Sequence, residues 1–262
     1  TLKLFKGLSF RNTTGMRYQT RRNDVFYGDK SITAKRSSIN GSIQNLETGS
    51  FQTSNVLNYN WSGKGHDVTA MVGQEYVDRW NRNFKAAASN FPNDDIGLAD
   101  LSLGLPTAVQ SAENYDDKLL SFFARVNYDY DNKYLLSLSI RRDESSKFHK
   151  DNRVGYFPSV SAGWNVHQEK WFQNPVMSKL KIRASYGELG ANFLNPYNFD
   201  AIAYGPIPYT VGGERYVTGR AAYLKSKDLK WETAKTTDIG IELGFFNNDL
   251  TLSLDYFVKK NV

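Results

Sequence analysis

An all-β fold, an antiparallel up-and-down sheet of the transmembrane β-barrel type, is the fold class that three features of the sequence predict. Apolar and polar residues alternate along most of the predicted strands, so that one face of each strand is apolar and the other polar. Short turns rich in Gly, Asn and Asp alternate with long connections. Aromatic residues are abundant, with 16 Tyr, 16 Phe and 5 Trp among 262 residues. We expect about nine strands, which form only part of a barrel.

The clearest strand follows the turn FFNND and reads LTLSLDYFVKK. Its leucines, Tyr256 and Val258 share one face, and Thr251, Ser253 and Asp255 lie on the other. The same reading along the chain predicts strands at Leu2–Tyr18, Ser50–Trp61, Asp67–Val77, Leu119–Tyr130, Tyr134–Arg142, Gly155–Val166, Leu180–Gly187, Trp231–Phe245 and Leu250–Lys259.

The connections between these strands are of two kinds. Three are tight turns of Gly, Asn and Asp, at 62–67, 129–134 and 245–249, and three are long and polar, at Thr20–Gln44, Asp78–Lys118 and Glu188–Lys230. Loops of this length are unusual in a compact soluble domain. An outer-membrane barrel has short turns at its periplasmic end and long loops outside the cell.

The two faces of each predicted strand differ in polarity. A charge that faces lipid at mid-depth costs about 2–4 kcal/mol, so we expect the polar faces to line the lumen. We predict lipid-facing positions at Leu120, Phe122, Leu136, Leu138, Ile241, Leu252 and Leu254. Phe123 and Phe257 are apolar residues on the polar side, where they have room to pack against something in the lumen.

Aromatic residues gather near both ends of the predicted strands. Tyr128, Tyr130, Tyr134, Trp164 and Phe245 flank the short turns, and Tyr76, Tyr156, Tyr186 and Tyr256 lie towards the long loops. Two such belts are typical of a barrel that crosses a bilayer. Cross-strand aromatic pairing in a soluble sheet is the alternative.

Composition narrows the class further. There is no cysteine, so a disulfide scaffold and a thiolate metal site are excluded. The net charge of +6 is spread along the chain, which argues against a nucleic-acid surface. No apolar run approaches the roughly 20 residues of a membrane helix. Residues 1–6 already read as strand, so we expect no signal peptide at this end.

The sequence offers weak candidates for catalysis or metal binding, and we predict no catalytic residue, metal or cofactor. His66, His149 and His167 have no partner at ligand spacing. Asp143 and Glu144 open an outer loop, where solvated ion pairing is expected. Calcium binding in PNDDIGLAD, with Asp94, Asp95 and Asp100, and phosphate binding at YGELG (186–190) are minor possibilities, since neither matches a known loop pattern.

Four stretches of sequence resemble the barrel of SusC/RagA-type TonB-dependent transporters. They run in the family's order at Asn127–Phe148, Asn152–Trp164, Leu180–Asn192 and Asp228–Lys260. The resemblance implies a 22-stranded outer-membrane barrel of a Gram-negative bacterium, with a plug inside and a SusD-type surface lipoprotein as lid. It also implies that TonB drives the import of glycans or peptides. Residues 1–262 then form an internal barrel segment, and we expect the plug, the TonB box and the closing strands to lie outside it.

Within that resemblance, two groups of residues are candidates for function. Seven inward charges are expected to be solvated in the lumen or to pair with the plug, namely Arg125, Arg141, Lys181, Arg183, Asp238, Glu242 and Asp255. Aromatic side chains in the outer loops are expected to bind substrate, because sugars stack on aromatic faces, and the candidates are Trp80, Tyr204, Tyr209 and Tyr216. Loop packing or contact with the lid is the alternative for each.

Two other classes of function stay open at this point. An outer-membrane barrel enzyme needs a nucleophile or an activated water with its partners at the rim, and this segment offers none. A soluble β-sandwich that binds carbohydrate or acts as an adhesin explains the alternation, but neither the aromatic belts nor the alternating loop lengths.

Overall fold

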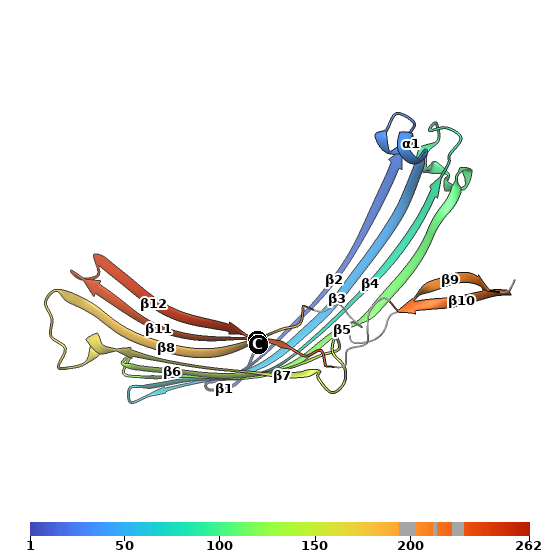
Figure 1. The fold of residues 1–262 in the computed structure, drawn as a ribbon. Helices are drawn as coiled ribbons and strands as arrows, with labels where there is room; N and C mark the ends of the chain where they lie inside the picture. The colour runs from blue at the N-terminus through green and yellow to red at the C-terminus, as the bar shows by residue number, and fades with distance from the viewer. Residues whose placement is uncertain (194–202, 212–213, 222–227) are drawn as a thin grey trace. The chain divides into compact units, whose positions relative to one another are not determined.

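A computed structural model shows a chain dominated by long β-strands (Figure 1). It describes residues 1–193, 203–211, 214–221 and 228–262, with only the backbone for 114–116, 203–210 and 215–221. Ten strands form one sheet in the order β1-β2-β3-β4-β5-β6-β7-β8-β11-β12, and β9 and β10 form a separate two-stranded sheet. Within the ten-stranded sheet, each strand therefore pairs with the next strand of that sheet along the chain, as the up-and-down prediction requires.

The chain divides into two compact units, of which the larger comprises Thr1–Thr14, Thr53–Tyr76 and Lys118–Val262. The strands with at least one end in this unit are β1 (Leu2–Phe5), β2 (Leu8–Tyr27), β3 (Asn40–Gly63), β4 (His66–Ser89), β5 (Leu105–Tyr130), β6 (Tyr134–Ser145), β7 (Val154–Asn165), β8 (Met177–Ala191), β9 (Ala203–Val211), β10 (Glu214–Ala221), β11 (Glu232–Phe245) and β12 (Leu250–Asn261). A 3₁₀ turn, η3 (Val166–Gln168), follows β7.

The three predicted tight turns are present, and their sequences explain them. Lys64 and Gly65, Asp131 and Asn132, and the run 246–248 all have positive φ. Gly, Asn and Asp adopt this conformation at the lowest cost, which suits short hairpin turns. The side chain of Asp129 also accepts a hydrogen bond from the backbone N–H of Asn132 (2.8 Å) and so closes the β5–β6 turn.

The second unit comprises Gly15–Gln52 and Val77–Asp117. Here β2, β3, β4 and β5 continue well past the predicted strands, and α1 (Ile32–Ser37), η1 (Gly97–Ala99) and η2 (Leu101–Leu103) connect them. The side chain of Ser31 caps α1 by accepting from the N–H of Ala34 (3.0 Å). Phe26 and Phe91 pack edge to face in the same unit, with ring centroids 5.7 Å apart.

The predicted long loops are therefore wrong in part. Thr20–Gln44 contains the end of β2, all of α1 and the start of β3, and Asp78–Lys118 contains the ends of β4 and β5. Glu188–Lys230 contains β9 and β10, which were not predicted. These parts of the strands have polar residues on both faces. They therefore lack the alternation of apolar and polar residues that predicts a strand, and their sequences resemble loops.

Candidate functional site

The hydrogen-bond register gives the larger unit two chemically distinct faces. Val126, Leu138 and Val160 are direct partners across β5, β6 and β7, and so share one face. The other face carries Arg125, its partner Ser139 on β6, and Ser159, the partner of Ser139 on β7. We call the first the apolar face and the second the polar face. Leu138 and Arg141 lie on opposite faces, as the alternation predicted.

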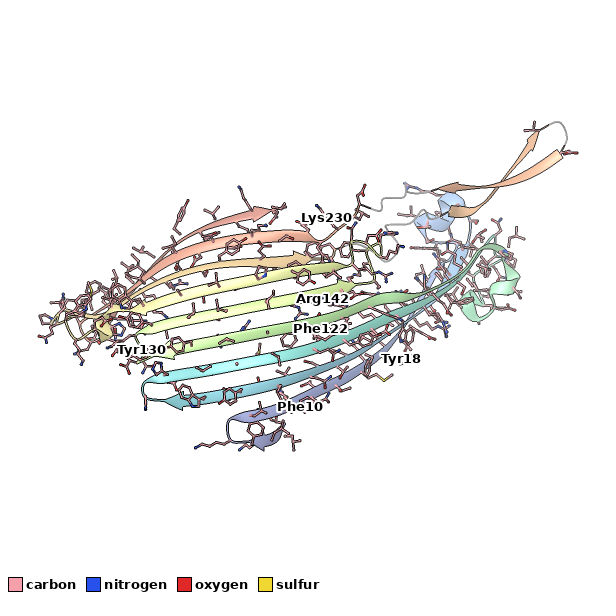
Figure 2. All side chains as sticks on the ribbon, turned by 90° about the horizontal axis from the view of Figure 1, so that it is seen from below. Phe10, Tyr18, Phe122, Tyr130, Arg142 and Lys230 are labelled. Atoms are coloured by element: carbon pink, nitrogen blue, oxygen red, sulfur yellow. The ribbon has the colours of Figure 1, made fainter. Side chains whose placement is uncertain are left out.

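The apolar face is open to its surroundings. Six of the seven positions predicted to face lipid are at least 38 % exposed, and they include Leu138 at 45 % and Leu254 at 58 %. Such a wide exposed apolar surface is unfavourable in water, and it indicates a membrane or protein contact. Figure 2 shows Phe122 beside Arg142, which is its partner in the register. The charged side chain of Arg142 marks the end of the apolar face on β6.

A group of aromatic residues borders the apolar face at the short-turn end. Tyr130 and Tyr134 are stacked with centroids 6.3 Å apart, and Tyr134 stacks on Trp164 at 6.4 Å. The Tyr134 hydroxyl (2.6 Å) and the Trp164 indole N–H (3.1 Å) both donate to Oε1 of Glu169 in the following turn. These two hydrogen bonds, with that of Tyr134 the stronger, lower the pKa of Glu169. The predicted aromatic belt is thus a connected structure at this end.

Arg141 is the centre of a polar-face network. Its guanidinium pairs with Asp143 (2.7 Å) on its own strand and with Glu75 (3.1 Å) on β4, and it donates to the buried hydroxyl of Ser121 (2.8 Å). It also lies 5.7 Å from the ring centroid of Phe123. Phe123 therefore lies on the polar side, as predicted, where it packs against a guanidinium.

Arg183 is the centre of a second network, on β8, β11 and β12. It pairs with Asp238 (3.4 Å), Glu242 (3.5 Å) and Asp255. Lys179 also pairs with Glu242, at 2.8 Å. Four of the seven predicted inward charges therefore meet in one cluster, in which three carboxylates surround one guanidinium.

The last two predicted inward charges, Arg125 and Lys181, lie outside these ion pairs. Lys181 lines a hollow of about 530 Å³ on the polar face, together with Arg183, Asp238, Asp67 and Asn127. Arg125 has no ion pair with the residues that the structure describes. Both are cations that remain open to another group above the polar face.

Three large aromatic side chains on the polar side were not recognised as a group in the sequence. Phe157 lies on the polar face, because it pairs with Arg141 in the register, and its ring contacts Trp231 at 5.4 Å. Trp231 also packs against Phe148, which is fully buried. Side chains on Gly155 or Gly190 would collide with the Phe157 ring, so both positions need glycine.

The same group fixes the loop between β6 and β7. The Trp231 indole donates to the carbonyl of Arg153 (2.9 Å), and the Arg153 guanidinium donates to the carbonyl of Phe148 (3.2 Å). The glycine at position 190 in YGELG was the only sequence signal of this packing, and the structure shows that the Phe157 ring covers it. The stretch lies inside β8 and not at the start of a loop, which corrects its predicted position.

Other charged partners were also missed. Glu75 was not selected, although its place in the alternation of β4 predicts the polar face, and the structure pairs it with Arg141. Asp143 is buried beside Arg141, and Glu144 pairs with Arg142 at 3.0 Å on the opposite face. The predicted ion pairing is therefore present, but its predicted place in a solvated outer loop is wrong: both carboxylates lie in β6, on opposite faces, and Asp143 is buried.

The predicted substrate-binding aromatics are found in strands. Trp80 lies in β4, over Gly49, with its ring 5.9 Å from that of Tyr18. Tyr204 and Tyr209 lie in β9 and Tyr216 in β10, and Tyr209 and Tyr216 are direct partners in the register. The side chains of these three tyrosines are outside the described residues. The segment Glu188–Lys230, predicted as a long loop, thus contains a two-stranded sheet that is separate from the ten-stranded sheet.

The candidates for catalysis and metal binding have structural partners. His66 Nδ1 lies 2.8 Å from the Tyr128 hydroxyl, and His167 Nδ1 lies 3.0 Å from the Leu180 carbonyl. Asp100 accepts from the backbone of Ser102 at 2.8 Å and so caps η2. Over the described ranges, no group of three or more His, Cys, Asp or Glu side chains is placed to hold a metal ion.

Comparison with known proteins decides the family. The family model described as "TonB dependent receptor-like, beta-barrel" matches residues 2–261. The chain belongs to this family of outer-membrane β-barrels. Among the described residues, no helix has the length and apolar character needed to cross a membrane.

Curated relatives place the chain within the family. It is 31 % identical to TonB-dependent receptor P3 of Formosa agariphila over 97 % of this chain and 25 % of the relative. It is 36 % identical to TonB-dependent receptor SusC of Bacteroides thetaiotaomicron over 58 % of this chain and 16 % of the relative. The chain thus spans about a quarter of the length of P3.

Solved structures agree with this placement. The RagAB peptide importer in its closed-closed state superposes with a TM-score of 0.82 at 26 % identity, over 98 % of this chain and 28 % of that chain. The chain is therefore a segment of a TonB-dependent receptor barrel of the SusC/RagA type. The family consists of receptors and transporters, and the polar and apolar faces fit a barrel wall.

Proposed function

We propose that this segment is part of the wall of a TonB-dependent outer-membrane importer. In this proposal the parent protein takes up glycans or peptides, works with a SusD-type surface lipoprotein, and performs no catalysis. The observation that carries the proposal is the match of residues 2–261 to the barrel family. The similarity to SusC and to the RagAB peptide importer supports the SusC/RagA type of transport.

The apolar face on β6 is close in height to the apolar band of a membrane barrel. On β6 it runs from Tyr134, in the aromatic belt, to Arg142, where charge begins. At about 3.4 Å per residue this distance is about 27 Å along the strand, and a tilt of about 40° reduces it to about 20 Å across the bilayer. A barrel's apolar band is about 25 Å tall. We therefore assign the apolar face to lipid and the polar face to the lumen.

The polar face supplies groups for the plug of the full-length protein. The carboxylates around Arg183 and the open cations Arg125 and Lys181 form a mixed-charge surface beside the 530 Å³ hollow. A plug held by such charges is released by small changes in geometry, because ion pairs in a wet lumen each contribute only about 0–1 kcal/mol. This suits a plug that must move during each transport cycle.

The second unit contains the connections between β2 and β3 and between β4 and β5, and neither is a tight turn. In this proposal the second unit, β9 and β10 lie outside the cell and contact the lid or the substrate. Trp80, Tyr204, Tyr209 and Tyr216 are the proposed aromatic contacts. Side-chain rings of this type favour sugars and apolar peptide groups, which can stack on them.

Uptake by living cells tests the proposed function. Deleting the gene of the parent protein is expected to abolish growth on its cognate oligosaccharide or peptide, and so is loss of TonB with the gene intact. Purified parent protein is expected to leave the nutrient chemically unchanged, as shown by mass spectrometry. Uptake that persists without TonB, or cleavage of the nutrient by the purified protein, would contradict the proposal.

A further inference from the structure

A hollow of about 530 Å³ lies on the apolar face near the tight turns, and we call it the alanine hollow. Its floor contains Ala162 on β7 and Ala184 on β8, which are direct partners in the register. Two methyl groups among longer side chains leave a depression in the sheet surface. The larger side chains of the same face that line the hollow are Tyr128, Tyr134, Leu136, Trp164 and Ile182.

A carboxylate lies at the aromatic end of the alanine hollow. Tyr134 and Trp164 form the wall there, and both donate to Oε1 of Glu169, at 2.6 and 3.1 Å. Oε2 of Glu169 accepts no hydrogen bond from the part of the chain that the structure describes, and the residue is partly exposed. Glu169 therefore keeps a charged acceptor beside the apolar surface.

Backbone hydrogen bonds fix both ends of the loop that carries Glu169. The N–H of Asn165 donates to the carbonyl of Lys133 (2.8 Å), which joins the start of the loop to the β5–β6 turn. The N–H of Phe246 donates to the carbonyl of Val176 (2.9 Å), which joins its end to the β11–β12 turn. A ligand of the carboxylate thus has little loop entropy to remove, and this favours binding.

The two residues after Glu169 suit a lipid headgroup. Trp171 is 66 % exposed, and its ring lies edge to face with that of Trp164, with centroids 6.4 Å apart. An exposed indole beside an apolar surface favours the boundary between hydrocarbon and water. Lys170 is also exposed and offers a cation to a phosphate. Apolar surface, carboxylate, indole and ammonium are therefore close together at one end of the sheet.

These groups select one class of lipid. A headgroup that carries only a phosphate suits Lys170 but is repelled by Glu169. A primary ammonium donates a charge-assisted hydrogen bond to the free oxygen of Glu169, whereas a quaternary ammonium has no N–H to donate. An acyl chain of the same lipid fits the apolar lining of the hollow. We propose that the alanine hollow and Glu169 bind a phospholipid of the phosphatidylethanolamine type, whose headgroup carries a primary ammonium and a phosphate.

Native mass spectrometry of the full-length parent tests this site, which rests on the proposed assignment of the apolar face to lipid. The delipidated protein in detergent is offered equal amounts of phosphatidylethanolamine, phosphatidylcholine and phosphatidylglycerol with identical acyl chains. The first lipid bound is expected to be phosphatidylethanolamine, preferred about tenfold, as one hydrogen bond to a charged group provides. Equal occupancy by the three lipids, or preference for either of the others, would overturn the proposal.

Glu169→Gln separates the charge of the site from its shape. The glutamine oxygen still accepts hydrogen bonds from Tyr134 and Trp164, but it carries no negative charge. This variant is expected to bind a lipid without preferring phosphatidylethanolamine over phosphatidylcholine. Asp249→Asn is the matched control, because Asp249 is an exposed carboxylate in the neighbouring β11–β12 turn, and it is expected to keep the preference. A preference that survives Glu169→Gln, or that Asp249→Asn removes equally, would overturn the proposal.

Ala184→Leu tests the hollow itself. Leucine fills the space of the acyl chain, so this variant is expected to weaken binding of the first lipid about tenfold. Ala124→Leu is the control, since Ala124 lies on the same face outside the hollow, and it is expected to bind as the wild type does. Heat-modifiability of each band is expected to show a folded barrel. Equal binding by the two leucine variants would overturn the proposal. A parent that imports its nutrient but binds lipids without preference leaves the transport proposal intact.

Discussion

Arg183 on β8 forms an ion pair with Asp255 on β12, across the intervening strand β11. The residue between them in the register is Gly240, which pairs directly with both. A side chain on Gly240 would meet the Arg183 guanidinium and the Asp255 carboxylate. The glycine thus lets two charges meet that lie two strands apart.

The variant Gly240→Ala is therefore expected to lower the free energy of unfolding by about 1–2 kcal/mol, because it separates this ion pair and leaves the cluster strained. Urea unfolding of the full-length barrel in detergent or lipid measures the loss. Gly187→Ala is the control, since a Cβ there makes only ordinary contact with Ser159 at 3.6 Å. Equal losses of unfolding free energy in Gly240→Ala and Gly187→Ala would show that the effect comes from replacing a strand glycine and not from the ion pair.

Arg141→Met is expected to destabilise the barrel by about 1–3 kcal/mol, because it leaves the buried carboxylate of Asp143 without its cation. Urea unfolding of the full-length barrel in detergent or lipid measures this loss. Arg125→Met, on the same face, is expected to change stability by less than about 0.5 kcal/mol. A loss from Arg125→Met as large as that from Arg141→Met would contradict the network described around Arg141.

Leu138→Arg tests the assignment of the apolar face to lipid. At mid-depth the charge is expected to cost about 2–4 kcal/mol, measured by refolding from urea into lipid vesicles. Ser139→Arg, on the neighbouring residue of β6, points to the polar face and is expected to cost far less. A near-neutral Leu138→Arg would place that residue away from hydrocarbon.

Cysteine labelling tests the proposed orientation. Gly205→Cys in β9 is expected to react with an impermeant maleimide on intact cells. Asp249→Cys, in the short turn between β11 and β12, is expected to react only after the outer membrane is opened. The reverse pattern would place the tight turns outside the cell.

The turn carboxylate of Glu169 gives a prediction on pH. Its pKa is lowered in the folded state by hydrogen bonds from Tyr134 and Trp164. At pH values above the pKa of the carboxyl in the unfolded state, about 4.3, the ionised carboxylate stabilises the fold through these hydrogen bonds. This contribution disappears as the pH falls through the lower pKa of the folded state. The stability difference between wild type and Glu169→Gln is thus expected to be constant from pH 7 to about 5.5 and to shrink below about 4. A constant difference down to pH 3 would contradict these hydrogen bonds.

Local sequence patterns were enough to predict the strands that alternate cleanly and the turns that join them. Leu138 and Arg141 fall on opposite faces because side chains alternate with a period of two, and this needs no knowledge of neighbouring strands. The turn at Asp131 and Asn132 was equally readable, since these residues tolerate positive φ. The family resemblance was carried by the same segments.

The contacts between distant residues became visible only once the strands were paired in the fold. Arg141 reaches Glu75, and Arg183 reaches Asp255, through registers between strands far apart in the chain, and no local pattern encodes such a register. The part of β4 that contains Trp80, beyond Val77, was predicted to be a loop, because polar residues on both of its faces hide the alternation. The hydrogen bonds that join Asn12, Asn55 and Gln74 were missed for a related reason: each residue alone gives no signal, and the pairing of β2, β3 and β4 brings them together.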